Sequence, residues 1–408
     1  MKQPIARIFA IVAVCAMLGA CSPAGHLGAS AQPTATAAVA VSAGSLSEGR
    51  MLDWSLTLLH LADNGVNTAI SAAALTSDIA ALRQGIQGQA RSEVAQALGA
   101  QDMSDKQIAD AAYKARQTLE KMKLGRYSAL WCMFVGEDQP VRETYLSECM
   151  KTLQMSSRFV SFTAEKGASL LNEWADTSSG GTISDLSFEV PSEEQPFFLD
   201  VVLADPDWQT ALDPAKTRPL PFTYEDGNKS AVPTLVYSGK CGIYQGTEGS
   251  MAILPLAGDE ARLVVLFPKG NAPLTDFYNL ALQKHDDWLS KATWGAQRVL
   301  LPRFSAGYSG SVKGALGYAG MAGLFQPDAD YSAMGQGLHP VDILADCRLI
   351  VDESGIGTPD SKATYRAGID DGVPTLAVNR SFLILLEKTD TGAILMAAAV
   401  RDPLKTLK

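Results

Sequence analysis

The stretch MLDWSLTLLHLADNGVNTAISAAALTSDIAALRQG, residues 51–85, holds two helical patterns separated by a short turn. In the first pattern, large apolar residues recur at helical spacing from Met51 to Leu61. This spacing predicts an amphipathic helix over residues 47–63. The second pattern predicts a helix over residues 70–84. The domain therefore begins with two helices in close succession.

Helical patterns dominate the first half of the chain, and strand patterns rich in β-branched or aromatic residues dominate the second. Such a distribution predicts an α+β fold, in which helices pack around large, mostly antiparallel β-sheets. The further helices are expected at 89–98, 106–123, 140–153 and 165–176. The strands are expected at 130–135, 158–162, 197–204, 251–256, 262–267, 298–304, 348–352, 381–387 and 393–400.

The N-terminus has the pattern of an export signal. Lys2 and Arg7 precede an apolar run over residues 8–20. That run is shorter than the about 20 apolar residues that cross a bilayer, so it predicts a secretory signal peptide at residues 1–20. The string Leu18-Gly19-Ala20-Cys21 resembles a bacterial lipobox, which implies cleavage before Cys21 and lipid on that cysteine. The alternative is an ordinary signal peptide with a cysteine there by chance.

The resemblance of residues 18–21 to a lipobox implies an exported lipoprotein that is anchored to the membrane of the cell envelope through Cys21. In a Gram-negative cell, the absence of Asp at Ser22 would favour the outer membrane. Residues 21–46 consist mostly of Ala, Ser, Thr, Gly and Pro, a composition that cannot bury enough surface to order itself, so they are interpreted as a flexible tether. No second linker or repeat follows, and residues 47–408 are expected to form one domain.

Charge and cysteine content exclude several classes of function. The formal net charge is −10, and no stripe of basic residues is available to neutralise phosphate groups. We therefore expect no nucleic-acid partner. No pair of cysteines has C-x-x-C spacing, and a zinc ribbon or a redox motif is not supported. An exported domain can form disulfides. The pattern favours buried thiols, with one or two disulfides as the alternative, at Cys132, Cys149, Cys241 and Cys347.

The sequence contains no motif of enzyme catalysis that we recognise. H-E-x-x-H, G-x-S-x-G, S-x-x-K, G-x-G-x-x-G and P-loop strings are missing. Four histidines occur, at His26, His60, His285 and His339. Glycines 317, 320 and 323 are interpreted as a glycine-rich helix or turn. We therefore predict no catalytic residue, no metal and no cofactor, and a hydrolase is disfavoured.

The order of several strings along the domain resembles the serpin family. No single string is specific, but together they span about residues 50–405. They are Asn67-Thr-Ala-Ile-Ser71 with Leu75, Gly85, Gly88 and Leu98; Asn172-Glu-Trp174 with Thr177, Gly181-Thr-Ile183 and Asp185-Leu186; Trp208, Asp213, Thr217 and Phe222; Val232-Pro233, Leu254-Pro255-Leu256 and Leu301-Pro302-Arg-Phe304; Leu316-Gly317, Leu324-Phe325 and Asp330; Asp352-Glu353-Ser-Gly355; and Ser381-Phe382, Gly392 and Arg401-Asp402-Pro403.

The resemblance implies a suicide-substrate inhibitor that has no catalytic site of its own. Family members expose a bait loop to a serine protease, and sometimes to a cysteine protease. After the protease attacks, the hinge side of the loop inserts as a new central strand in the main sheet, and strain stored in the intact protein is released. We expect a monomer whose partner is a serine protease of unknown identity.

In this chain the bait loop corresponds to residues 353–382. Counting along the loop places the scissile bond near Gly368-Ile369-Asp370, and a trypsin-like protease would cut after Arg366 instead. By the resemblance, the hinge consists of Glu353, Gly355, Ile356, Thr358, Pro359, Asp360 and Lys362. The family pattern turns Ile356, Thr358, Asp360, Lys362 and Thr364 inward in an inserted strand, whose alternate side chains face the core.

Two features depart from the inhibitor pattern. Insertion would bury Asp360 and Lys362 at several kcal/mol per ion unless they pair well, and Pro359 has no N–H for the ladder. Beneath the sheet, the family's serine pair, asparagine and histidine correspond to Ser71, Ala74, Asp200 and Ala345, while Trp208 at the insertion point is retained.

Because of these departures, a non-inhibitory binding or structural protein with the same fold remains the alternative. The hinge residues lead us to expect that cleavage of the bait loop raises the melting temperature only slightly.

Overall fold

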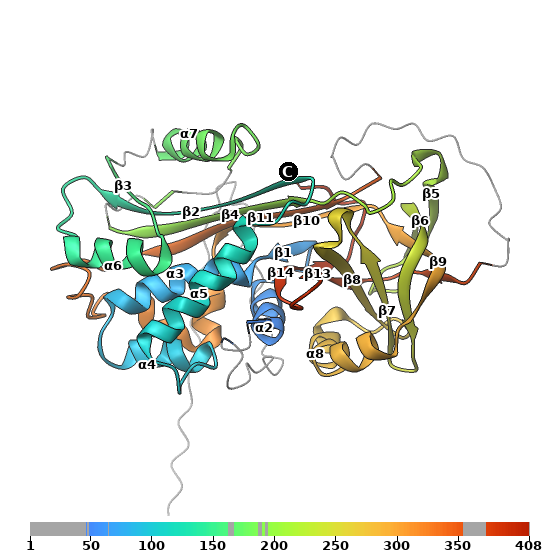
Figure 1. Ribbon diagram of the computed structural model, residues 1–408, viewed down its shortest axis with the longest axis horizontal. Helices are drawn as coiled ribbons and strands as arrows, with labels where there is room; N and C mark the ends of the chain where they lie inside the picture. Colours follow the sequence, from blue (N-terminus) through green and yellow to red (C-terminus); the bar gives the residue numbers. More distant parts are fainter. Residues whose placement is uncertain are drawn as a thin grey trace, which may run out of the picture. The chain divides into compact units, whose positions relative to one another are not determined.

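The computed structural model describes residues 46, 49–63, 65–161, 167–186, 190–191, 195–353 and 373–407. Within this part, helices pack around two large sheets, and the expected α+β architecture is confirmed (Figure 1). None of the described helices is long and apolar enough to cross a membrane. The predicted signal peptide and tether, residues 1–20 and 21–46, lie outside the described residues except for Leu46, and the domain boundary at residue 47 stays a prediction.

The first sheet has five strands. Its second and third strands in spatial order, β11 and β4, are parallel neighbours, and β2 and β3 are also parallel. The other two contacts are antiparallel. All nine residues of β4 are buried. In spatial order the strands are β10 (Phe304–Ser311), β11 (Asp342–Val351), β4 (Phe197–Asp205), β2 (Arg126–Gly136) and β3 (Ser157–Val160).

The second sheet has nine strands and is antiparallel except between β12 and β9. The C-terminal strand β14 is buried at every residue, as its apolar sequence predicts. The strand order is β1 (Thr68–Ile70), β14 (Ile394–Val400), β13 (Phe382–Lys388), β8 (Ala261–Pro268), β7 (Gly249–Pro255), β6 (Lys229–Gln245), β9 (Thr293–Pro302) and β12 (Thr375–Ala377), with β5 (Arg218–Thr223) paired to β6.

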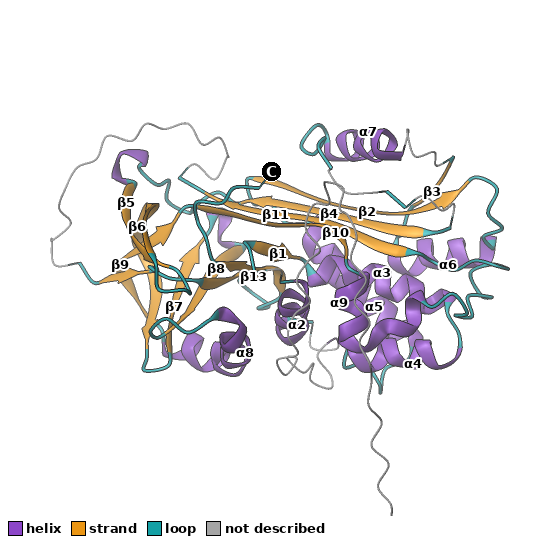
Figure 2. Ribbon diagram, turned by 180° about the vertical axis from the view of Figure 1, so that it is seen from behind, coloured by secondary structure: helices purple, strands orange, loops and turns teal. Residues whose placement is uncertain are grey.

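The helices cover both faces of the five-stranded sheet. Figures 1 and 2 show α7 on one face and α3, α5 and α6 on the other. The helices are α2 (Leu52–Ala62), α3 (Ala72–Gly85), α4 (Gly88–Ala97), α5 (Asp105–Glu120), α6 (Glu143–Leu153), α7 (Gly167–Ser179), α8 (Leu274–Lys291) and α9 (Lys313–Leu316). Short helical turns are η1 (Pro214–Lys216), η2 (Ala257–Asp259), η3 (Gly317–Met321) and η4 (Ala322–Phe325).

Local sequence explains where α3 and α5 begin. The Ser71 hydroxyl caps α3 by accepting a hydrogen bond from the Ala74 amide, and Ser104 with Gln107 forms a reciprocal capping box on α5. Helix α3 packs against α5, α6, β4 and β14 and is buried on nearly every side. It is therefore the central helix beneath the sheet.

The core is divided by the five-stranded sheet. The larger apolar cluster lies on the α3 face and continues into the nine-stranded sheet. The smaller cluster packs α7 against the other face of β2, β4 and β11. Because side chains alternate along a strand, each residue of the central strands belongs to one cluster or the other.

Most expected elements are present. The strand expected at 298–304 is divided between β9 and β10, because Pro302 cannot donate to a ladder and the chain passes from one sheet to the other. Helix α8 and the strands β1, β5, β6 and β12 were missed. The α8 sequence does have apolar residues at helical spacing, including Phe277, Ala281 and Trp288, so a signal was available. The glycine-rich segment forms helical turns, as expected.

Candidate functional site

The centre of the five-stranded sheet is a seam between two parallel strands. Eight residues of β11, from Asp342 to Leu349, pair in register with β4, and Ala345 lies directly opposite Asp200. The chain leaving β11 passes through Asp352 and Glu353 into residues 354–372, which are not described, and reappears before β12 in the other sheet. A strand inserted between β4 and β11 from this segment would run antiparallel to both.

Two side chains hold the end of β11. The indole Nε1–H of Trp208 donates a 2.7 Å hydrogen bond to the main-chain carbonyl of Asp352. Arg303 lies 3.5 Å from the Glu353 carboxylate, whose side chain is 7% exposed. Trp208 also packs against Tyr237, with ring centroids 5.9 Å apart. Trp208 therefore lies beside the residue that follows β11, and its assignment to an insertion point stays a prediction.

Ser71 connects the start of α3 with both sheets. Its hydroxyl donates a 2.7 Å hydrogen bond to the Leu395 carbonyl in β14. Its main-chain amide contacts the Cys347 thiol of β11, although burial is the main influence on that thiol and raises its pKa. Ser71 and Asp200 therefore both lie beneath the seam, while Trp208 lies at its end, beyond β4.

A buried pair of carboxyl groups lies under β4. Asp200 of β4 and Asp78 of α3 are both 0% exposed and lie close enough for each carboxyl group to shift the pKa of the other. None of their four carboxyl oxygens has a hydrogen-bond partner among the described residues. Burial raises the pKa of Asp200 to about 6 and that of Asp78 well above its usual range, where the Asp200 charge raises it further. Two such carboxyl groups hold one proton between them near neutral pH.

Arg116 of α5 supplies the positive charge next to this pair. Its guanidinium donates to the main-chain carbonyls of Leu153 (2.6 Å) and Gln154 (2.9 Å) and lies 3.5 Å from the centre of the Trp131 ring. Burial lowers the pKa of Arg116 to about 10, against the opposing effect of Asp78, so the group stays charged at neutral pH. With one shared proton, Arg116 and the carboxyl pair are neutral together.

The polar cluster beneath the sheet differs in composition from the one that the family resemblance implies. Ala74 and Ala345 contribute no polar side chain to it, whereas Asp78, Asp200 and Arg116 do. The sequence analysis missed Asp78 and Arg116. Asp78 was detectable, because the apolar residues Leu75 and Leu82 stand at helical spacing on either side of it and place it on the buried face of α3.

A second charged cluster lies on the other face of β11, the face of the sheet that α7 covers. Arg348 of β11 donates to Asp346 at 2.7 Å and to the Asp185 carboxylate at 2.6 Å. Asp185 belongs to the segment that follows α7, so this contact ties β11 to that segment. Asp346 is 1% exposed and also accepts a 3.0 Å hydrogen bond from Ser309 of β10.

Several predicted site residues lie outside the described part of the chain. They are Cys21; the hinge residues Gly355, Ile356, Thr358, Pro359, Asp360 and Lys362; and the scissile region Arg366, Gly368, Ile369 and Asp370. Their assignments stay predictions. The four predicted thiols Cys132, Cys149, Cys241 and Cys347 are buried and unpaired, as the sequence favoured.

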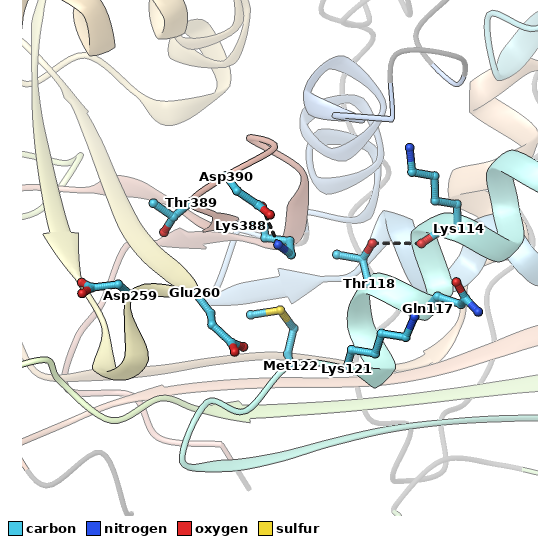
Figure 3. Close-up of a pocket in the computed structure, with 10 residues that line it drawn as sticks. All are labelled: Lys114, Gln117, Thr118, Lys121, Met122, Asp259, Glu260, Lys388, Thr389 and Asp390. Atoms are coloured by element: carbon cyan, nitrogen blue, oxygen red, sulfur yellow. Dashed lines mark hydrogen bonds and ion pairs between the residues drawn. The ribbon is translucent and has the colours of Figure 1, made fainter.

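A surface cavity of about 640 Å³ lies between the end of α5 and the turn that joins β13 to β14 (Figure 3). Its lining mixes lysines and acidic side chains, and Lys388 pairs with Asp390 within the turn that lines one side of it. No nucleophile and general base meet among the ten residues that line it. No group of three or more potential metal ligands is found among the described residues either.

The sequence of the chain matches a protein-family model. The family model described as serpin (serine protease inhibitor) matches residues 55–403, which is most of the chain. The chain belongs to the serpin family. The described parallel seam, anchored hinge and C-terminal strands all fall inside the matched residues.

The sequence identity to individual serpins is low. The chain is 26% identical to sheep (Ovis aries) antithrombin-III over 66% of its length, which covers 61% of that protein. It is 23% identical to mink (Neovison vison) plasminogen activator inhibitor 1 over 83% of its length, covering 87% of that protein. An uncharacterised serpin-like protein of the archaeon Methanosarcina acetivorans is 24% identical over 68% of the chain and 66% of that protein.

Solved structures confirm the fold. The mouse protein-Z dependent protease inhibitor aligns with a TM-score of 0.75 and 21% identity, covering 88% of this chain and 98% of that one. Tengpin, a thermophilic serpin in its native state, aligns with a TM-score of 0.74 and 20% identity over 87% of this chain and 94% of that one. At this identity the likeness concerns the fold alone.

Proposed function

We propose that this serpin inhibits a serine protease outside the cytoplasm by acting as a suicide substrate. The parallel seam between β4 and β11 carries the proposal. The segment 354–372 leaves β11 next to this seam, and a strand inserted from it would turn one parallel pair into two antiparallel pairs. Antiparallel pairs are slightly more stable per residue, so insertion has a driving force. This activity requires no catalytic residue on the chain itself.

The strain that drives insertion would be held by the anchored hinge. Trp208 and Arg303 keep Asp352 and Glu353 at the end of β11 in the uninserted state. Attack by a protease in the predicted scissile region frees the N-terminal side of the loop to move into the seam. The protease, still joined through its acyl bond, is carried along and its active site is distorted.

The proposal includes a membrane anchor. A lipid on Cys21 and the tether of residues 21–46 would hold the inhibitor at the cell envelope, at the outer membrane if the cell is Gram-negative. There it would meet proteases of the periplasm or the cell surface. This part rests on the resemblance of residues 18–21 to a lipobox.

Covalent trapping is the decisive test. The protein is mixed with trypsin-like, chymotrypsin-like and elastase-like proteases and analysed by denaturing gel electrophoresis. We expect a band at the summed mass of serpin and protease for at least one of them. The matched control is the same protease with its catalytic serine replaced by alanine, which should give no such band.

The alternative is a non-inhibitory serpin whose loop is a plain substrate, and the hinge residues Pro359, Asp360 and Lys362 favour it. It predicts cleavage without a trapped complex for every protease. The first cut in limited proteolysis should fall between Ala363 and Val373 in both cases. A first cut elsewhere would show that this loop is not the exposed bait.

A further inference from the structure

Residues 180–186, which follow α7 and which we call the strap, lie over β4. Arg126 of β2 donates a 3.1 Å hydrogen bond to the main-chain carbonyl of Thr182. Arg348 of β11 donates at 2.6 Å to the Asp185 carboxylate and at 3.0 Å to the main-chain carbonyl of the same residue. Since β4 lies between β2 and β11, these contacts stand two strand spacings apart, about 10 Å, which matches the reach of three residues. The strap therefore crosses β4 from β2 to β11.

The strap is fixed to the α7 side of the seam. Asn172 of α7 donates a 3.3 Å hydrogen bond to the Leu186 carbonyl and accepts a 2.7 Å hydrogen bond from the Leu186 amide. The Ser179 hydroxyl accepts a 2.9 Å hydrogen bond from the Ile183 amide. Strands β2 and β4 pair in register along the whole of β4. The strap, α7, β2 and β4 therefore form one unit, and the Arg348–Asp185 contact links this unit to β11.

Arg348 stays with β11 when the two strands part. Its guanidinium donates to Asp346 of the same strand at 2.7 and 3.2 Å, and Asp346 is 1% exposed, whereas the Asp185 side chain is 71% exposed. A strand that enters the seam would widen the distance between β4 and β11 from about 5 Å to about 10 Å. The 2.6 Å contact between Arg348 and Asp185 cannot span this added distance while Arg348 remains on Asp346.

We propose that the Arg348–Asp185 contact is an electrostatic latch that holds the β4–β11 seam closed at the end where insertion would begin. Arg348 pairs in register with Leu203 near the end of β4, and the chain leaves β11 a few residues later, at Asp352. Breaking the latch leaves Arg348 on Asp346, so no buried charge loses its partner, and the latch slows opening without preventing it. Its effect on insertion rests on the proposed function, and Arg348 acts there as a positioning residue.

Hydrogen–deuterium exchange of the intact protein tests the latch without any loop insertion. Asp185→Asn removes the charge of the strap and keeps the main-chain hydrogen bond to Arg348. We expect peptides of β4 and β11 to exchange about two- to fivefold faster than in the wild type, the range for loss of an exposed ion pair. Peptides of β13 and β14, in the other sheet, should be unchanged. Equal acceleration in both sheets would show a general loss of stability and would overturn the latch.

Matched variants and salt show whether the charge of Asp185 is responsible. Asp185→Glu keeps the charge and should exchange as the wild type does. Asp176→Asn removes an exposed carboxylate of α7 and should also have no effect. Raising the salt concentration from about 0.01 M to about 1 M shortens the screening length from about 30 Å to about 3 Å, so it should accelerate exchange at the seam more in the wild type than in Asp185→Asn. Equal acceleration of the two proteins by salt, or an Asp185→Glu variant as fast as Asp185→Asn, would contradict the latch.

Cleavage of the predicted bait loop separates the latch from the proposed function. With protease in excess, the melting temperature is followed with time after cleavage in the wild type and in Asp185→Asn. We expect the variant to reach its final melting temperature about two- to fivefold sooner. If the melting temperature rises equally fast in both proteins, the latch is wrong while insertion stands. If it rises in neither, but the seam of Asp185→Asn exchanges faster, the latch stands and the proposed function is overturned.

Discussion

Trp208 donates its indole N–H to the main-chain carbonyl of Asp352 at 2.7 Å. This hydrogen bond joins the segment that follows β4 to the residue that follows β11, directly before the predicted bait loop. The donor and acceptor are 144 residues apart in the sequence. The bond therefore fixes where β11 ends and where any inserted strand must begin.

Replacing Trp208 by Phe should loosen this anchor. The ring remains, but the buried Asp352 carbonyl loses a donor, and the free energy of unfolding should fall by about 1–2 kcal/mol. Proteolysis within residues 363–373 should become faster. Chemical denaturation and timed proteolysis measure the two effects. Trp54→Phe is the control, because Trp54 donates a buried 3.2 Å hydrogen bond to Thr76 away from the hinge. Equal acceleration of proteolysis in both variants would contradict the anchor.

The Arg348 cluster predicts unequal effects of its two carboxylates. Asp185→Asn removes an exposed partner and should cost less than about 1 kcal/mol, since the Asp185 side chain is 71% exposed. Arg348→Met leaves the buried Asp346 without its cation and should cost about 3 kcal/mol. Urea denaturation at neutral pH measures both. Similar costs for the two variants would show that Asp346 does not depend on Arg348.

The carboxyl pair predicts that the intact protein loses stability as pH rises. Unfolded carboxyl groups titrate near pH 4, whereas burial raises the pKa of Asp200 to about 6 and that of Asp78 further above its usual range. Above about pH 4 the native state holds a proton that the unfolded state has lost. The contribution of Asp200 to stability is full below about pH 4 and is lost as pH rises through about 6, in total about 2–3 kcal/mol. That of Asp78 is lost only at higher pH.

Denaturation of the uncleaved protein at about pH 5 and about pH 8 measures this loss. Asp200→Asn should show a smaller decrease than the wild type, because the amide does not titrate. Other groups titrate over the same range, so the difference between the two proteins is the relevant quantity. An identical decrease in both would mean that the pair holds no extra proton.

The lipobox resemblance predicts a processing defect. Globomycin, which blocks cleavage of lipoprotein signals, should leave a precursor that retains residues 1–20, and Cys21→Ser should release or misprocess the protein. Membrane fractionation with immunoblotting distinguishes the forms. Cys15→Ser changes a cysteine inside the apolar run and is the control, expected to be processed normally. Full processing and membrane association of Cys21→Ser would exclude the lipid anchor.

Much of the local structure could be predicted because it depends on short-range periodicity. The apolar spacing of residues 51–85 and the wholly apolar β14 each indicate an element without knowledge of the rest of the chain. Helix α8 had the same kind of signal and was missed. The division at Pro302 was harder, because the residues on both sides favour strands and only the sheets to which they pair separate them.

By itself the sequence determined the α+β class, the order of most elements and the family resemblance, since all of these lie in patterns local to the chain. The tertiary structure decided that Asp78 and Asp200 share a buried site and that Arg116 lies beside them. These three residues come from α3, β4 and α5, and nothing in their local sequences relates them. Their proximity follows from the register of β4 and from the packing of two helices beneath it, where exclusion of water gives the pair its shared proton.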